Sequence, residues 1–175
     1  MIYTRNQDNL FARICNFFDR MAYNIVQAKI YTTNHGYALN NFIVLDQSGK
    51  SVSYSGLLKF IELELTKKIE IDNPLEAPLQ GRVSRQVKYM SIKAQVKITT
   101  ELQGNHLTLE IVAGDRPGLL AYVANVLLQH DIELHNAKIN TLGNRAEDSF
   151  LISAKQNAPI NAAKIEQLIQ SLSNI

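Results

Sequence analysis

The four residues Asp115 to Gly118 have types and a spacing that could bind a small zwitterion. They follow an alternating apolar pattern, Leu107 to Ala113, and precede a helical pattern that begins at Leu119. A glycine in such a turn leaves backbone N–H groups accessible at the helix N-terminus, where they attract a carboxylate. The carboxyl group of Asp115 could pair with an ammonium group. Two simpler interpretations stay open: Asp115 only caps the helix, and Gly118 only allows a tight turn.

No other set of residues indicates catalysis or metal binding. The single cysteine, Cys15, rules out an internal disulfide and is predicted to be a small buried residue on a helix. The histidines lack the spacing of metal ligands: His35, His106, His130 and His135. The chain shows no nucleophile–base pair, so we expect no catalytic residue, no metal site and no cofactor in it.

The composition is that of a globular chain with one or two domains. Of its 175 residues 46% are hydrophobic and 19% charged, and the formal net charge is +2. We find no membrane-spanning run and no signal peptide, and we expect a cytoplasmic protein without membrane or nucleic-acid partners. A basic stretch keeps one alternative open, a nucleic-acid-binding ferredoxin-like protein, although the strands lack aromatic residues for base stacking: Arg82, Arg85, Lys88, Lys93 and Lys97.

An internal repeat organises the elements that must position the turn. When the sequence is shifted by 109 residues, seven of the 23 positions from Leu10 to Thr32 are identical to their counterparts. The offset becomes 108 further on, where Asn41 to Val44 aligns with Ser149 to Ile152. The chain therefore contains two copies of one unit.

Each copy reads as strand, helix, strand, strand, helix. In the second copy we predict strands at His106–Ala113, Ile132–Leu142 and Arg145–Ala154, a helix from Leu119 to His130 and a last helix from about Pro159. In the first copy we predict a helix at Leu10–Met21, strands at Ile25–Thr33 and Tyr37–Leu45, and a helix from about Ser55 to Ile69. Met1 to Thr4 resembles the end of a strand.

One further strand, Lys93–Thr99, precedes the second copy and forms a hairpin with its first strand. It would occupy the strand-4 place of a ferredoxin-like sheet with order 4-1-3-2. The predicted class is α+β: two ferredoxin-like sandwiches, each an antiparallel four-stranded sheet with two helices on one face, the second with a permuted leading strand. The predicted domains are 1–71, which lacks its leading strand so that the natural chain would start upstream, and 87–175, joined by a linker at 72–86.

Several motifs resemble the ACT domains of bacterial PII uridylyltransferase/uridylyl-removing enzymes. In the second copy they are Asp115-Arg116-Pro117-Gly118-Leu119-Leu120-Ala121, the block from His135 to Gly143 and the block from Arg145 to Phe150. In the first copy they are Asp8 to Ala12, Ala28 to Thr33 and Phe42 to Asp46. The resemblance covers nearly the whole chain and points to the C-terminal tandem ACT region of that family.

The resemblance implies a regulatory role rather than catalysis. The parent enzyme of this family adds UMP to the nitrogen-signalling PII protein and removes it, and its tandem ACT region is taken to sense glutamine. The catalytic motifs of the family are absent from this sequence. The implied partners are a small amino acid, the catalytic domains of the parent chain, PII through the parent, and a second copy that pairs through the ACT sheets or helices.

The resemblance also implies where the ligand binds. It places an amino acid between the strand-to-helix loop of one ACT domain and the second-strand start of its neighbour. The positions that match in the second copy are Asp115, Gly118, Leu119, Glu133 and Asn136. Those that match in the first copy are Asn6, Asn9, Leu10 and Asn24, with Gln27 in the place of Asn136. Asn136 could instead only satisfy a strand edge, and the sequence leaves open which copy binds.

Overall fold

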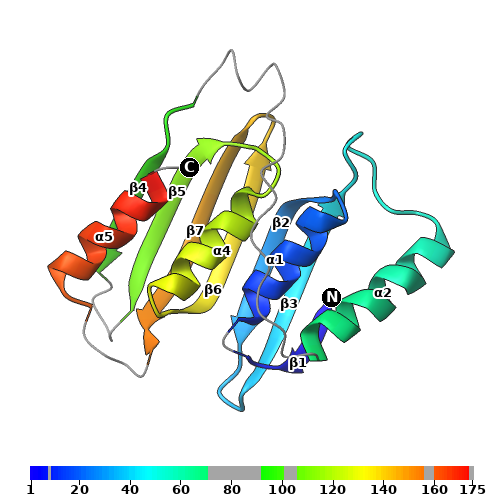
Figure 1. Cartoon of the computed structure of the whole chain (residues 1–175), viewed down its shortest axis with the longest axis horizontal. Helices are drawn as coiled ribbons and strands as arrows, with labels where there is room; N and C mark the ends of the chain where they lie inside the picture. The colour runs from blue at the N-terminus through cyan, green and yellow to red at the C-terminus, as the bar shows by residue number, and fades with distance from the viewer. Residues whose placement is uncertain (8, 71–91, 101–105, 156–159, 174–175) are drawn as a thin grey trace.

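The computed structural model describes residues 1–7, 9–70, 92–100, 106–155 and 160–173 (Figure 1). The predicted linker at 72–86 lies outside them. The elements are β1 (Ile2–Arg5), α1 (Leu10–Arg20), β2 (Asn24–Thr32), β3 (Tyr37–Leu45), α2 (Ser55–Glu70), β4 (Gln95–Thr100), β5 (Leu107–Gly114), α4 (Leu119–Gln129), β6 (Ile132–Leu142), β7 (Arg145–Ala154) and α5 (Ala162–Ser173).

All seven of these strands form one open antiparallel sheet with the order β1-β3-β2-β6-β7-β5-β4. The second half has the predicted order, because β4 pairs antiparallel with β5 at the edge of the sheet. The first half contributes β1-β3-β2, with β1 at the opposite edge. The molecule is therefore α+β, with an architecture compatible with ferredoxin-like folds.

The two copies meet where β2 pairs with β6. Lys29 lies opposite Lys138, which is its own repeat counterpart. On either side Ala28 pairs with Ile139, and Ile30 pairs with Ala137. Counterparts thus exchange places across the joint, and an approximate two-fold axis passes between the two lysines.

The helices lie on one face of the sheet, with α1 and α4 side by side over the joint (Figure 1). Alternation in the strands supplies the apolar layer beneath them: in β5 the side chains of Leu107, Leu109, Ile111 and Ala113 are buried, and the residues between them are not. The larger core cluster contains Phe11 and Ile30 from the first copy together with the second-copy residues. This larger cluster therefore joins the two copies, whereas a second, smaller cluster consists of first-copy residues alone.

Candidate ligand-binding site

The turn between β5 and α4 is built by Gly118. This glycine is the N-cap of α4 and has a φ of 79°, in the left-handed region that favours glycine. The N–H of Leu119 donates to the carbonyl of Arg116 at 3.2 Å, and that of Tyr122 to the carbonyl of Gly118 at 2.8 Å. The expectation that Asp115 caps the helix is wrong, since the N-cap lies three residues later and the cap has no side-chain hydrogen bond. The carboxyl group of Asp115 is thus not used by the helix.

The first copy repeats this turn with a different residue at the cap. The N–H of Leu10 donates to the carbonyl of Gln7 at 3.1 Å, and that of Arg13 to the carbonyl of Asn9 at 2.9 Å. Asn9 has a φ of −120°, so it does not take the left-handed conformation of Gly118. Its side-chain oxygen accepts a hydrogen bond from Nε of Arg13 at 2.9 Å. The two loops therefore have the same backbone hydrogen bonds but different cap chemistry.

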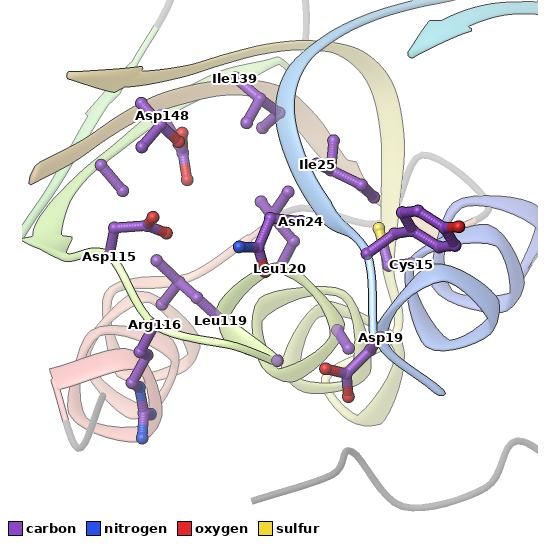
Figure 2. Close-up of a pocket in the computed structure, with 15 residues that line it drawn as sticks. Cys15, Asp19, Asn24, Ile25, Asp115, Arg116, Leu119, Leu120, Ile139 and Asp148 are labelled. Atoms are coloured by element: carbon purple, nitrogen blue, oxygen red, sulfur yellow. The ribbon is translucent and has the colours of Figure 1, made fainter. Parts of the chain in front are cut away.

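A cavity that we call pocket A lies between the second-copy loop and the start of β2 in the first copy. Asp115, Gly118, Leu119 and Asp148 line it from the second copy, and Asn24 lines it from the first. In Figure 2 the carboxyl groups of Asp115 and Asp148 point toward one another, whereas Arg116 extends away from them. The free volume is about 30 Å³, which is room for water rather than for a whole amino acid.

A second cavity, pocket B, lies between the first-copy loop and the start of β6. Asn6, Leu10 and Asn40 line it from the first copy, and Glu133 lines it from the second. Its free volume is about 40 Å³. Each pocket thus combines the loop of one copy with the second strand of the other.

The two pockets are related by the repeat, residue by residue. All ten residues that line pocket B have their repeat counterparts in pocket A. The pairs are Asn6 with Asp115, Gln7 with Arg116, Leu10 with Leu119, Phe11 with Leu120, Ile30 with Ile139, Thr32 with Thr141, Ala38 with Ala146, Asn40 with Asp148, Glu133 with Asn24 and Leu134 with Ile25. The same hollow has therefore been built twice about the two-fold axis.

Pocket A holds a buried carboxyl group. Asp148 is 3% exposed, its Oδ1 accepts the N–H of Asn140 at 3.3 Å, and its Oδ2 has no hydrogen-bond partner. Burial raises the pKa of Asp148 to about 7. The hydrogen bond from Asn140 lowers this pKa, and the nearby carboxyl group of Asp115 raises it further. Burial also raises the pKa of Asp115. The pocket therefore favours a cation or a proton.

Pocket B has an amide in the corresponding place. Asn40 is 1% exposed, and its Oδ1 has no hydrogen-bond partner. The acidic group of this pocket is instead Glu133, half-buried where β6 begins. The two pockets share their shape but not the positions of their charges.

The structure brings most of the predicted site residues together. Asp115, Gly118 and Leu119 join Asn24 in pocket A, while Asn6 and Leu10 join Glu133 in pocket B. Asn9 is not among the residues that line either of these cavities.

Asn136 lies on the opposite face of the sheet, where it lines another hollow with Lys29, Tyr31 and Lys138. A β-bulge between Leu134 and Asn136 explains this, since one extra residue moves all later side chains to the other face. The structure therefore does not bring Asn136 to either pocket.

Sequence reasoning missed Asp148 and Asn40 as site residues. Both occupy inward-facing strand positions, and Asp148 lies between the buried Ala146 and Phe150. A polar residue in an apolar register, repeated in both copies, is a signal that was present in the sequence.

A Ser–His contact at the end of β7 was also missed. Nε2 of His135 lies 2.8 Å from Oγ of Ser153, and the ring of His135 packs edge-on against His106. Ser153 is 1% exposed, and its hydroxyl donates to the carbonyl of Ala154 at 3.2 Å. The hydroxyl of Ser153 is too buried for a substrate to reach it. We therefore interpret the contact as structural, holding the end of β7 in place, and not as a nucleophile with its base.

Other site types find little support in the part of the chain described. There, no cluster of three or more histidine, cysteine or acidic residues is arranged to hold a metal ion, and no helix has the length and apolarity to cross a membrane. Cys15 is buried as expected. Of the basic stretch, Arg82, Arg85 and Lys88 lie outside the described residues, and Lys97 pairs with Glu110 at 3.4 Å.

Comparison with known proteins shows relatives of one kind. The chain is 46% identical over 153 residues to a bifunctional uridylyltransferase/uridylyl-removing enzyme of Nitrosospira multiformis, covering 87% of this chain and 17% of the relative. It is 44% identical over 176 residues to the enzyme of that name from Aromatoleum aromaticum, covering 98% of this chain and 20% of the relative. The chain thus spans about a fifth of these curated relatives. No family model and no solved structure matches it.

Proposed function

This chain matches a fragment of the bifunctional uridylyltransferase/uridylyl-removing enzyme, and we propose that the fragment is a tandem ACT unit that senses an amino acid, glutamine, for such an enzyme. It performs no catalysis itself. Its ligand biases whether the catalytic domains of the parent chain add UMP to the PII protein or remove it.

The observation that supports this most is the pair of repeat-related pockets, each made from both copies. An amino acid presents a carboxylate and an ammonium group a few bonds apart. At pocket A the first turn of α4, whose cap has no side-chain hydrogen bond, offers backbone N–H groups beyond that of Leu119 for the carboxylate. Asp115 and Asp148 offer oxygens for the ammonium group. This pairing of donors and acceptors fits a zwitterion.

The small volume of the pockets suggests how binding would act on a larger protein. A cavity of about 30 Å³ must widen to admit an amino acid, and its walls belong to different copies. A ligand therefore selects a more open arrangement of the loop and the start of β2. A ligand shifts a conformational equilibrium by its difference in affinity for the two states. Movement between the copies is thus the quantity that we expect the catalytic domains to detect.

Calorimetric titration and thermal unfolding of this chain test the proposal. Glutamine should bind and raise the melting temperature, because a ligand at 100 times its Kd stabilises the native state by about 2.7 kcal/mol. D-glutamine is the matched control, since it has the same groups with the opposite configuration at its α-carbon. Absence of any binding or thermal shift at millimolar glutamine would reject glutamine sensing by this fragment.

A further inference from the structure

The repeat places a carboxyl group and an amide at the same point of two related cavities. Asp148 on β7 and Asn40 on β3 are counterparts at the 108-residue offset, and both are almost completely buried. Each has one side-chain oxygen without a hydrogen-bond partner: Oδ2 in Asp148 and Oδ1 in Asn40. Both side chains line their pockets. An unpartnered buried acceptor that lines a cavity is costly for the protein alone and favourable once a ligand donor reaches it.

The remaining polar positions differ in a complementary way. At the loop position pocket A has Asp115 and pocket B has Asn6. At the second-strand position the order is reversed, with Asn24 in pocket A and Glu133 in pocket B. Pocket A therefore has carboxyl groups on the loop, at Asp115, and on the sheet, at Asp148, whereas the carboxyl group that lines pocket B is that of Glu133 at the strand start.

We propose that Asp148 is the receptor for a positively charged ligand group, so that pocket A requires an ammonium group at its floor whereas pocket B accepts a neutral N–H donor there through Asn40. This rests on the proposed function, because it assumes that both pockets admit amino-acid-like ligands. It assigns the two pockets different ligand selectivity, which makes the tandem unit a sensor with two unlike sites.

The physical argument is the cost of an unpaired carboxylate. A buried carboxylate without a partner is strongly unfavourable, and a cation or a proton relieves that cost. An ammonium group provides a charge-assisted hydrogen bond to Oδ2, which a neutral amide cannot match. Asn40 carries no charge, so a hydrogen bond to its oxygen contributes a similar binding free energy whichever N–H donor makes it.

Without ligand, Asp148 retains a proton near neutrality, since burial raises its pKa to about 7. The other titratable or charged groups that line pocket A are Asp115 on the loop, Arg116 beside it, Asp19 and Cys15 on α1, and Tyr23 just before β2. The pKa of Cys15 is raised well above its usual range by burial, so the thiol stays neutral. An ammonium group that reaches Asp148 displaces its proton, and binding at pocket A should therefore release roughly one proton at about pH 6 and much less at about pH 8.5.

Isothermal calorimetry of the folded chain, in buffers of different ionisation enthalpy, measures that proton release. The probes are glutamine and glutaramic acid, which lacks the α-ammonium group. The variants are Asp148→Asn and Asn40→Asp. Ser149→Ala serves as the matched control, because it lies next to Asp148 in β7 but lines the hollow on the other face. Circular dichroism confirms that each variant is folded.

We expect glutamine binding by the unaltered chain to release protons at about pH 6. Asp148→Asn should abolish the release and weaken one class of site at pH 8 by about tenfold or more. Asn40→Asp should create a second proton-releasing site that no longer takes glutaramic acid. Ser149→Ala should bind as the unaltered chain does.

Two results separate failure of this inference from failure of the proposed function. If Asp148→Asn binds glutamine with unchanged affinity and proton release, Asp148 is not the receptor and the inference is wrong, although amino-acid binding stands. If the unaltered chain binds no glutamine at all, the proposed function itself fails.

Discussion

At the scale of single residues, the carboxyl group of Asp148 couples folding to pH. The pKa of an aspartate in an unfolded chain is about 3.9, whereas in the folded chain burial raises that of Asp148 to about 7. As pH rises between these values, the unfolded state loses its proton first. The free energy of unfolding therefore falls as pH rises over this range. Above about pH 7 this decrease in stability is complete.

Asp148→Asn should remove this dependence. We expect the variant to be more stable than the unaltered chain by about 1–3 kcal/mol at pH 8, with the difference shrinking toward pH 4. Urea unfolding at several pH values measures it. Parallel stability curves for the two proteins across that range would show that the buried group does not titrate as described.

Gly118 is the second residue with a definite expectation. Its φ of 79° costs an L-residue about 1 kcal/mol, so Gly118→Ala should lower the free energy of unfolding by about that amount. Gly49→Ala is the matched control, because Gly49 has a φ of 78° in a turn outside both pockets.

Both variants should therefore be destabilised alike, and glutamine affinity should fall only in Gly118→Ala. Equal affinity in the two variants would remove the loop at Gly118 from the binding site. The comparison separates backbone strain, which both share, from the loss of access to the helix N-terminus.

At the scale of elements, the joint between β2 and β6 carries a like-charge pair. Lys29 and Lys138 lie directly opposite each other on the face of the sheet that the helices do not cover. Like charges at such positions destabilise a sheet, and opposite charges contribute roughly 0.2–1 kcal/mol. The apolar neighbours of the pair face the helices, and their burial holds the joint together in spite of the repulsion.

Lys29→Glu should therefore stabilise the chain by about 0.5–1 kcal/mol at low salt, with less gain at high salt. Lys29→Gln, which removes the repulsion without adding attraction, should give an intermediate value. Chemical denaturation at two ionic strengths tests this ranking of the three stabilities. A loss of stability in Lys29→Glu would indicate that the two side chains do not face each other.

At the scale of the whole molecule, the two copies share one sheet and the larger of two hydrophobic clusters, while the smaller cluster lies within the first copy. The ring of Phe11 on α1 packs edge-on against Phe150 on β7, with centroids 6.3 Å apart, so a first-copy side chain fills the second-copy core. Such a shared core makes independent folding of the halves unfavourable.

We therefore expect a single cooperative unfolding transition, with equal calorimetric and van't Hoff enthalpies. Phe11→Ala should move this single transition to lower temperature. The free energy of unfolding should fall by about 3–5 kcal/mol, the usual cost of removing a buried aromatic ring. Differential scanning calorimetry provides the measurement. Two resolved transitions, of which Phe11→Ala moves only one, would contradict the shared core.

The sequence alone determined the local features of this protein. Strand alternation and helical spacing placed the bounds of β3, β6 and β7 as the structure has them, since these patterns depend on near neighbours. The repeat revealed two copies, and the hairpin pattern before Leu107 predicted that β4 lies beside β5. The resemblance to the uridylyltransferase family is supported by the relatives.

Only the tertiary structure decided how the copies combine. The pairing of β2 with β6 joins residues more than a hundred positions apart, and no local pattern specifies it. That pairing brings Asn24 to Asp115 and Glu133 to Asn6. The bulge in β6 turned Asn136 away, because one inserted residue reverses every later side chain. The direction of a side chain at the joint depends on the partner strand. The set of residues that line each pocket could therefore be known only from the tertiary structure.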